Sequence, residues 1–208
     1  MPPGRAPMTS PFTQYETTDV RDLIAEYPLA WVCAAGGEAE QASLLPLLGE
    51  YDSDGRLLRL LGHMARRNPL VERLAVDPRV LILFSGPQAY VSPEHAGRRD
   101  WGPTWNYAQL RIEAELVFEP EQTGAAITEL VDAMEQGRDA PWSSTELGAR
   151  YAGMEAMVIG FRAKVTGLQG LFKLGQDERP EVFEAILASI GDPALVRWMR
   201  RFGERRAG

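Results

Sequence analysis

Apolar and polar positions alternate along much of the chain in short segments that are typical of β-strands. The longest segment runs from Trp105 to Phe118, where every second residue from Leu110 onward is apolar. We interpret Glu113 and Glu115, which lie between these positions, as a solvated face rather than as paired catalytic carboxylates. Further apolar runs predict strands at residues 29–35, 43–51, 57–61, 80–84, 89–91, 157–161 and 163–165.

Turn and helix signals separate these runs. Residues 52–55 (DSDG) predict a hairpin turn, Gly36-Gly37 predicts another turn, and 89–91 is expected to pair with 80–84 across Gly86-Pro87. Thr18 and Asp19 are expected to cap a helix at 20–26, and Asn68 to cap a helix that begins at Pro69. Periodic apolar residues predict other helices at 121–135, 142–151, 181–189 and 194–201.

The number and order of these elements predict a mainly β fold with flanking helices. A small antiparallel barrel buries six or seven strands without leaving open sheet edges. Because no internal repeat or flexible linker is visible, we expect one domain over residues 1–208 that ends in the C-terminal helices.

Composition and charge narrow the possible partners. The 208 residues are 45% hydrophobic and carry a net charge of −7, which disfavours nonspecific nucleic-acid binding. Arginines at 197, 200, 201, 205 and 206 either complement the dipole of a solvated helix, which we favour, or contact nucleic acid.

No apolar run reaches the roughly 18 residues of a membrane span, and residues 1–10 lack a signal-peptide core, so we expect a cytoplasmic protein with no membrane contact. Cys33 is interpreted as an inert strand residue rather than a reactive thiol.

Residues 62–69 (GHMARRNP) form the first candidate site. An arginine pair beside an Asn-Pro helix start favours a phosphate, because guanidinium groups and backbone N–H groups meet there. His63 is expected in a loop, where a structural role and a role in the site are equally supported, and Arg66 and Asn68 lie next to it.

Residues 103–107 (PTWNY) form the second candidate site. Trp105 and Tyr107 are either a core aromatic pair or a wall beside a planar cofactor, and Asn106 offers an amide between them. Residues 167–177 are rich in glycine and too polar for a core. Their Lys173 and Gln176 are therefore expected at a ligand or at a subunit interface.

Several chemistries have no support in the sequence. Phosphate-loop, dinucleotide-fold and nucleophile-elbow motifs are absent. His63, His95 and Cys33 are too few and too scattered for a zinc site, so no metal is expected.

Four motifs together resemble the PaiB-type family, known as FMN-binding negative transcriptional regulators. They are Gly-His-x-Ala-Arg-x-Asn-Pro, Tyr-x-Ser-Pro, Pro-Thr-Trp-Asn-Tyr and Lys-Leu-x-Gln, and the resemblance extends from about Phe12 to Ile190. The chain departs from the family's pattern at Gly175 and Asp177, which flank Gln176, and at residues 94–97, where the family usually carries an aromatic.

The resemblance implies an FMN-binding split β-barrel that forms a homodimer with flavin at the subunit interface. It implies that Arg66 holds the FMN phosphate and that residues 45–47 pass along the isoalloxazine ring. It also places Trp105 and Lys173 near the two-fold interface. The cofactor-binding positions that it implies are His63, Arg66, Asn68, Thr104, Trp105, Asn106, Tyr107, Lys173 and Gln176.

Three functions stay open at this point. The first is a flavin- or redox-linked regulator, and the second is an FMN-dependent oxidoreductase, for which no catalytic side chain need be visible. The third is a haem-binding split barrel with His63 or His95 as axial ligand. Direct DNA binding is possible but disfavoured, because the net charge is −7 and no reading helix is evident.

Overall fold

A computed structural model of the chain describes residues 10–36 and 41–205. Gly37 of the predicted turn and Arg206 of the arginine series lie outside these ranges. The chain divides into two compact units, which are described separately. The barrel unit comprises Thr17–Phe84 and Leu110–Leu168, and the second unit comprises Met1–Glu16, Ser85–Gln109 and Gln169–Gly208. The single domain predicted over residues 1–208 stays a prediction.

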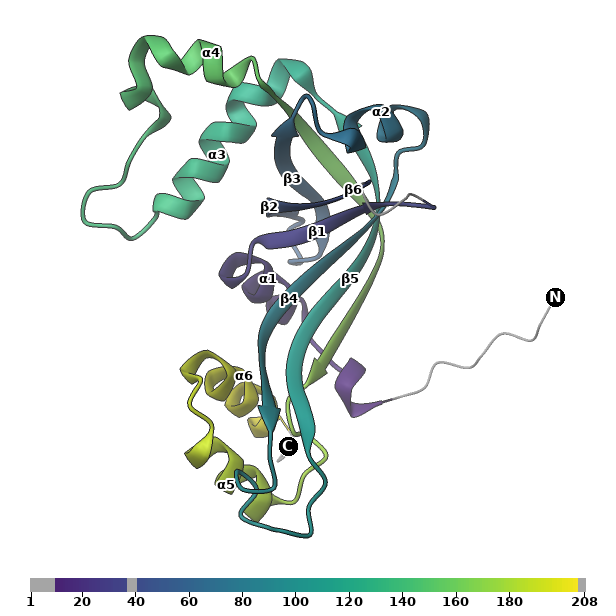
Figure 1. Cartoon of the computed structure of the whole chain (residues 1–208), viewed down its shortest axis with the longest axis vertical. Helices are drawn as coiled ribbons and strands as arrows, with labels where there is room; N and C mark the ends of the chain where they lie inside the picture. Colours follow the sequence, from purple (N-terminus) through teal and green to yellow (C-terminus); the bar gives the residue numbers. More distant parts are fainter. Residues whose placement is uncertain (1–9, 37–40, 206–208) are drawn as a thin grey trace, which may run out of the picture. The chain divides into compact units, whose positions relative to one another are not determined.

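Six antiparallel strands close into a barrel, which confirms the predicted fold class (Figure 1). Their order around the barrel is β1-β2-β3-β6-β5-β4. The strands are β1 (Leu29–Ala34), β2 (Ala42–Tyr51), β3 (Leu57–Ala65), β4 (Arg79–Val91), β5 (Thr104–Phe118) and β6 (Val158–Lys173).

A glycine on β3 lets two large side chains pack closely inside the barrel. Gly62 is paired with Leu47 on β2 and with Phe161 on β6. A Cβ atom at Gly62 would lie 2.6 Å from Leu47 Cδ2 and 2.8 Å from Phe161 Cζ. Both side chains are fully buried, so the missing side chain of Gly62 lets them fill the interior between β2 and β6.

Helices cover the barrel unit from outside. They are α1 (Thr17–Glu26), α2 (Pro69–Val76), α3 (Thr123–Glu135), α4 (Tyr151–Glu155) and the 3₁₀ segments η3 (Pro120–Gln122) and η4 (Ser144–Arg150). Helix α1 begins at Thr17, so Thr18 and Asp19 lie in its first turn rather than before it, and Asp19 is buried. The helix predicted from residue 121 begins at Thr123, because η3 precedes it.

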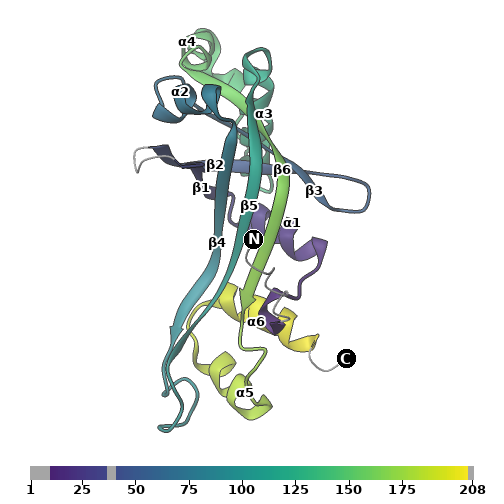
Figure 2. The same cartoon turned by 90° about the vertical axis from the view of Figure 1, so that its right-hand side faces the viewer.

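The second unit holds η1 (Pro11–Thr13), α5 (Pro180–Ser189) and α6 (Pro193–Glu204) beside the remaining parts of β4, β5 and β6 (Figure 2). Its core is a stack of rings: Phe172 lies 4.8 Å from Phe202 and 5.9 Å from Trp198, measured between ring centroids. Asp192 caps α6 by accepting N–H bonds from Ala194 and Leu195. Among the described helices, none is long and apolar enough to cross a membrane.

Strands β4 and β6 are each continuous where the sequence pattern predicts two separate strands. The expected hairpin at Gly86-Pro87 is wrong, because β4 continues through both residues. Pro87 lies beyond Phe84, where the pairing of β4 with β1 ends, so its missing N–H group is tolerated there. Strand β6 likewise continues through Gly167 and Gly170, where the glycines let neighbouring side chains approach its backbone.

Candidate functional site

Two exposed arginines, Arg66 and Arg67, follow β3 directly, and with Asn68 they form what we call the arginine loop. The Arg66 backbone N–H donates to the Met157 carbonyl at 2.9 Å, and Arg66 Nε donates to the Ala156 carbonyl at 3.2 Å. Both acceptors lie between α4 and β6. A guanidinium carries five N–H groups, so about four remain on Arg66 for other acceptors.

Asn68 builds the helix start beside these arginines. Its Oδ1 accepts the Leu70 N–H at 3.0 Å, and its backbone carbonyl accepts the Val71 N–H at 2.9 Å. Its Nδ2 donates to Ser43 Oγ on β2 at 2.9 Å. The expectation of free N–H groups at this helix start is therefore wrong for Leu70 and Val71. The capacity to hold an anion comes from the guanidinium groups instead.

His63 lies on β3 and not in a loop, which corrects the expectation from the sequence. It is paired with Gly160, whose missing Cβ would lie 3.0 Å from the Thr123 Cα of α3. Because paired residues share a face of a sheet, His63 lies on the face that α3 covers. Its Nδ1 is buried and has no hydrogen-bond partner, and burial lowers the pKa of His63.

Lys173 contacts two other candidate residues of the second unit, Thr104 and Trp105. Its Nζ donates to the Trp105 carbonyl at 2.9 Å and to Thr104 Oγ1, and it lies 5.9 Å from the ring centroid of Phe12. We call Phe12, Thr104, Trp105 and Lys173 the lysine cluster. The structure therefore brings Thr104, Trp105 and Lys173 together, as the motifs predicted for a shared site.

At the start of β5 the two aromatic side chains are exposed or half-buried, and the residue between them is buried. Trp105 is 54% exposed and packs edge-on against Tyr90, with 6.0 Å between ring centroids, and Tyr107 is half-buried. Asn106 is the buried residue, and its Nδ2 donates to Met199 Sδ at 3.6 Å. The core alternative is thus wrong for Trp105, whose exposed ring is available to a planar ligand.

Gln176 closes the turn that follows β6. Its Oε1 accepts the Leu174 N–H at 2.7 Å, and its Nε2 donates to the Phe172 carbonyl. This turn requires a positive φ at Gly175, which is 83°. Glycine adopts this conformation without steric cost because it has no Cβ atom.

Arg67, the second member of the predicted arginine pair, is exposed like Arg66. One residue beside the arginine loop escaped the sequence reasoning. Ser43 gave no signal, because it is 25 residues from Asn68 and only the β-sheet brings them together. Cys33 lies on β1 as expected but is only partly buried, and burial raises the pKa of its thiol.

These groups can recognise a ligand through its negative charge and through its flat aromatic surface. The arginine loop provides cationic donors suited to a phosphate, and Trp105 provides an aromatic face. No cluster of three or more metal-binding side chains occurs within residues 10–36 and 41–205.

Comparison with known proteins decides the family. The profile of the "Putative FMN-binding domain" family matches residues 8–167. This chain belongs to that family. It is 29% identical over 133 residues to the protease synthase and sporulation protein PAI 2 of Bacillus subtilis (strain 168), which confirms the predicted PaiB resemblance. That match covers 63% of this chain and 64% of the relative, so it spans less than two thirds of the relative's length.

Solved structures confirm the split-barrel fold. The FAD and haem binding protein of Mycobacterium smegmatis matches with a TM-score of 0.58 at 14% identity, covering 85% of this chain and 80% of that one. The flavocytochrome Anf3 of Azotobacter vinelandii matches with a TM-score of 0.54 at 13% identity, covering 76% of this chain and 68% of that one. At these identities the likeness concerns the fold alone.

The buried ring of His63 yields a prediction about pH. The unfolded chain takes up a proton near pH 6.5, whereas the folded chain does so only at lower pH, so stability falls as pH drops below 6.5. Replacing His63 with Gln should reduce this slope by up to about 1.4 kcal/mol per pH unit. Urea unfolding of both proteins between pH 7 and pH 5 measures it, and identical slopes would contradict the assignment.

Proposed function

We propose that the flavin of this family member is FMN and that the arginine loop holds its phosphate. The observation that carries the proposal is the exposed pair Arg66 and Arg67 at the end of β3, within the region that matches the FMN-binding family. FMN ends in a phosphate dianion, whereas riboflavin has none. Two adjacent guanidinium groups match that charge and its several acceptor oxygens.

The contacts around the loop support this assignment. The carbonyl groups of Ala156 and Met157 fix the Nε and the backbone of Arg66, so its outer N–H groups are oriented before a ligand arrives. Ser43 and Asn68 bind each other beside the loop and stabilise the start of α2. When bound, flavin supplies electron transfer, and the protein supplies its placement and surroundings.

Within the second unit, we propose that the lysine cluster binds cofactor, as its motifs imply. Lys173 holds Thr104 and the backbone of Trp105 in place, while the Trp105 ring stays exposed. Asn106, Tyr107 and Gln176 are proposed to act mainly by shaping this region, since Asn106 and Gln176 already bind neighbouring groups.

Replacing Arg66 with Ala should weaken FMN binding about ten- to a hundredfold, because one charge-assisted contact to a partly buried phosphate is lost. Quenching of flavin fluorescence during titration measures the affinity. The matched control is Arg56→Ala, which removes an exposed arginine just before the other end of β3 and should leave binding unchanged. Equal affinity of Arg66→Ala and the unchanged protein would remove Arg66 from the site.

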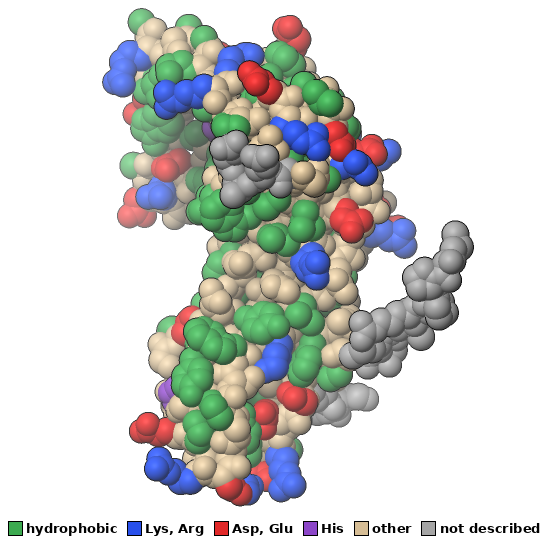
Figure 3. Space-filling model, turned by 45° about the vertical axis from the view of Figure 1, so that its right-hand side comes forward, with side chains coloured by type: hydrophobic (Ala, Val, Ile, Leu, Met, Phe, Trp, Pro, Cys, Tyr) green, Lys and Arg blue, Asp and Glu red, His purple; other side chains and the backbone are tan. Residues whose placement is uncertain are grey.

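We also propose a homodimer that covers the outer face of β1 and β2. Trp31 and Leu44 are paired across these strands and are 48% and 44% exposed, and Leu29 beside them is 50% exposed. Hydrophobic side chains form patches on the surface that Figure 3 shows. Large apolar patches of this kind commonly mark protein interfaces.

Replacing Trp31 with Glu should therefore shift the protein to a monomer, because the charge would have to be buried in the interface. Light scattering coupled to size exclusion should give about twice 23.1 kDa for the unchanged chain and about 23.1 kDa for the variant. Val76→Glu, on the exposed end of α2, is the control and should remain dimeric. A monomeric unchanged chain would rule out this interface.

A flavin-linked regulatory role is proposed over direct reading of DNA by this chain. The net charge of −7 opposes association with a polyanion. A haem is less well supported than flavin, because His63 lies on the face covered by α3 and the Nδ1 of His95 accepts the Ser92 N–H. An FMN-dependent oxidoreductase remains compatible with the same site.

A further inference from the structure

Two exposed aromatic side chains contact each other on the second unit. Among the described residues of that unit, Tyr90 on β4 and Trp105 on β5 are the large hydrophobic side chains that lie exposed, at 47% and 54%. Their ring centroids are 6.0 Å apart, and the ring planes meet at 63°. Tyr90 is not one of the proposed cofactor-binding positions, although it touches Trp105, which is.

Both rings lie on the side of the sheet opposite to the core of the unit. Side chains alternate along β5, so Trp105 points away from the face on which Asn106 is buried against Met199 of α6. On β4, Val91 is fully buried directly after the exposed Tyr90. The pair therefore presents aromatic surface that the core of the unit does not cover.

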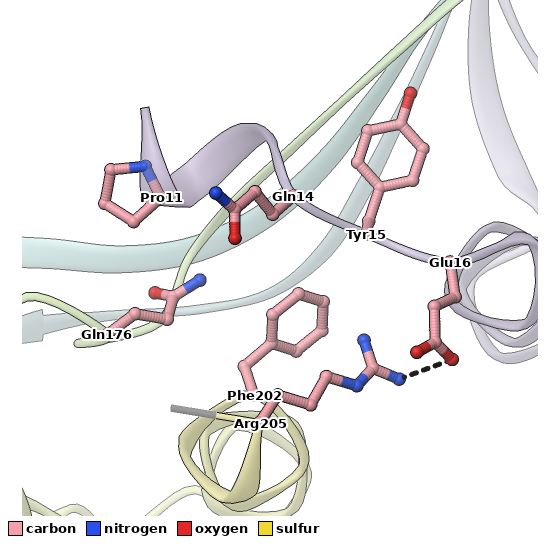
Figure 4. Close-up of a pocket in the computed structure, with 7 residues that line it drawn as sticks. All are labelled: Pro11, Gln14, Tyr15, Glu16, Gln176, Phe202 and Arg205. Atoms are coloured by element: carbon pink, nitrogen blue, oxygen red, sulfur yellow. Dashed lines mark hydrogen bonds and ion pairs between the residues drawn. The ribbon is translucent and has the colours of Figure 1, made fainter. Parts of the chain in front are cut away.

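The rings beside α6 offer no comparable surface. Phe202 is 3% exposed, because it stacks on Phe172 and the Arg205 guanidinium lies over its ring. The ring of Tyr15 points away from the pocket that Phe202 and Arg205 line (Figure 4). A flat ligand of the second unit is thus directed to the exposed pair rather than to this pocket.

Trp105 is held through both its backbone and its ring. Lys173 Nζ donates to the Trp105 carbonyl at 2.9 Å and also to Thr104 Oγ1, which fixes the backbone. The edge-on contact with Tyr90 favours one orientation of the indole ring. An exposed ring that is oriented before a ligand arrives loses little conformational freedom on binding, and this favours affinity.

We propose that the isoalloxazine ring of a flavin stacks on Trp105, and that Tyr90 is the positioning residue that orients Trp105 for this contact. Isoalloxazine is flat and electron-poor, whereas the face of an indole ring is electron-rich, so the two surfaces are complementary. Both residues lie within the range 8–167 that matches the FMN-binding family. The inference rests on the proposed flavin function, but it does not depend on the arginine loop or on the phosphate.

Titration of the full chain with lumiflavin tests the inference, because lumiflavin carries the isoalloxazine ring without the ribityl chain and the phosphate. Quenching of its fluorescence should give a dissociation constant of about 0.1 mM or tighter. Trp105→Leu should weaken binding at least about tenfold, and Tyr90→Leu about three- to tenfold. Tyr90→Phe keeps the ring contact and should bind within about twofold of the unchanged chain.

Two further variants test whether Tyr90 acts through Trp105. Adding Tyr90→Leu to Trp105→Leu should weaken binding no further, because the ring that Tyr90 orients is already absent. A further loss in this double variant would contradict the positioning role. Trp142→Leu removes an indole that is 38% exposed in the barrel unit, and it should leave the affinity for lumiflavin unchanged.

No binding of lumiflavin, or normal binding by Trp105→Leu or Tyr90→Leu, would overturn the inference. So would a Trp105→Leu variant that becomes monomeric in light scattering but binds lumiflavin normally, because a second copy would then cover this face. Comparing FMN with riboflavin separates the two proposals. Lumiflavin binding that depends on Tyr90, without preference for FMN, would count against the arginine loop alone. A preference for FMN with normal lumiflavin binding by Tyr90→Leu would count against this inference alone.

Discussion

The pairing of β3 with β2 on one side and β6 on the other is the constraint on which the barrel depends. Gly62 makes this possible, because any side chain there would collide with Leu47 or Phe161. A charge network also joins the three strands. Arg162 on β6 bonds to Glu50 on β2 at 2.7 Å and to Glu119, and Arg59 on β3 bonds to the other oxygen of Glu50 at 2.6 Å.

This network fixes register more than it adds stability. Burial raises the pKa of Glu50, but hydrogen bonds from Arg162 and Arg59 outweigh it, and the net pKa is lowered. Partly exposed ion pairs of this kind contribute roughly 0–1 kcal/mol each. Their geometric effect is larger, because a slip of one residue would turn every side chain of β3 to the opposite face. The register in turn places the arginine loop beside the carbonyl groups that precede β6.

The local elements could be predicted from the sequence because they depend on neighbours along the chain. Asn68 and Pro69 carry a helix-start signal that needs no tertiary contact, and the alternation from Leu110 to Leu116 marks a half-buried strand by itself. The motif residues likewise led to the right family. Thr104 and Trp105 were proposed with Lys173 as cofactor-binding positions, but their contacts with Lys173 were not predicted.

The errors arose where distant contacts override local signals. Glycine and proline at 86 and 87 suggested a turn, but β4 continues through both residues, and Pro87 is tolerated because the pairing of β4 with β1 ends at Phe84. His63 looked like a loop residue because the apolar run ends at Leu61, whereas pairing with Gly160 extends β3 to Ala65. For Trp105 the sequence left a core position and a cofactor wall open, and the structure exposes its ring while Asn106 is buried against Met199 of α6. None of these partners is visible from sequence spacing.

The central claim is that the arginine loop recognises the phosphate of FMN. The most direct measurement is the affinity of the full chain for FMN and for riboflavin under the same low-salt conditions, since the two ligands share the ring system and differ in the phosphate. Two guanidinium contacts predict that FMN binds at least about tenfold more tightly, with the difference shrinking as salt is added. Equal affinity for the two flavins would contradict the account.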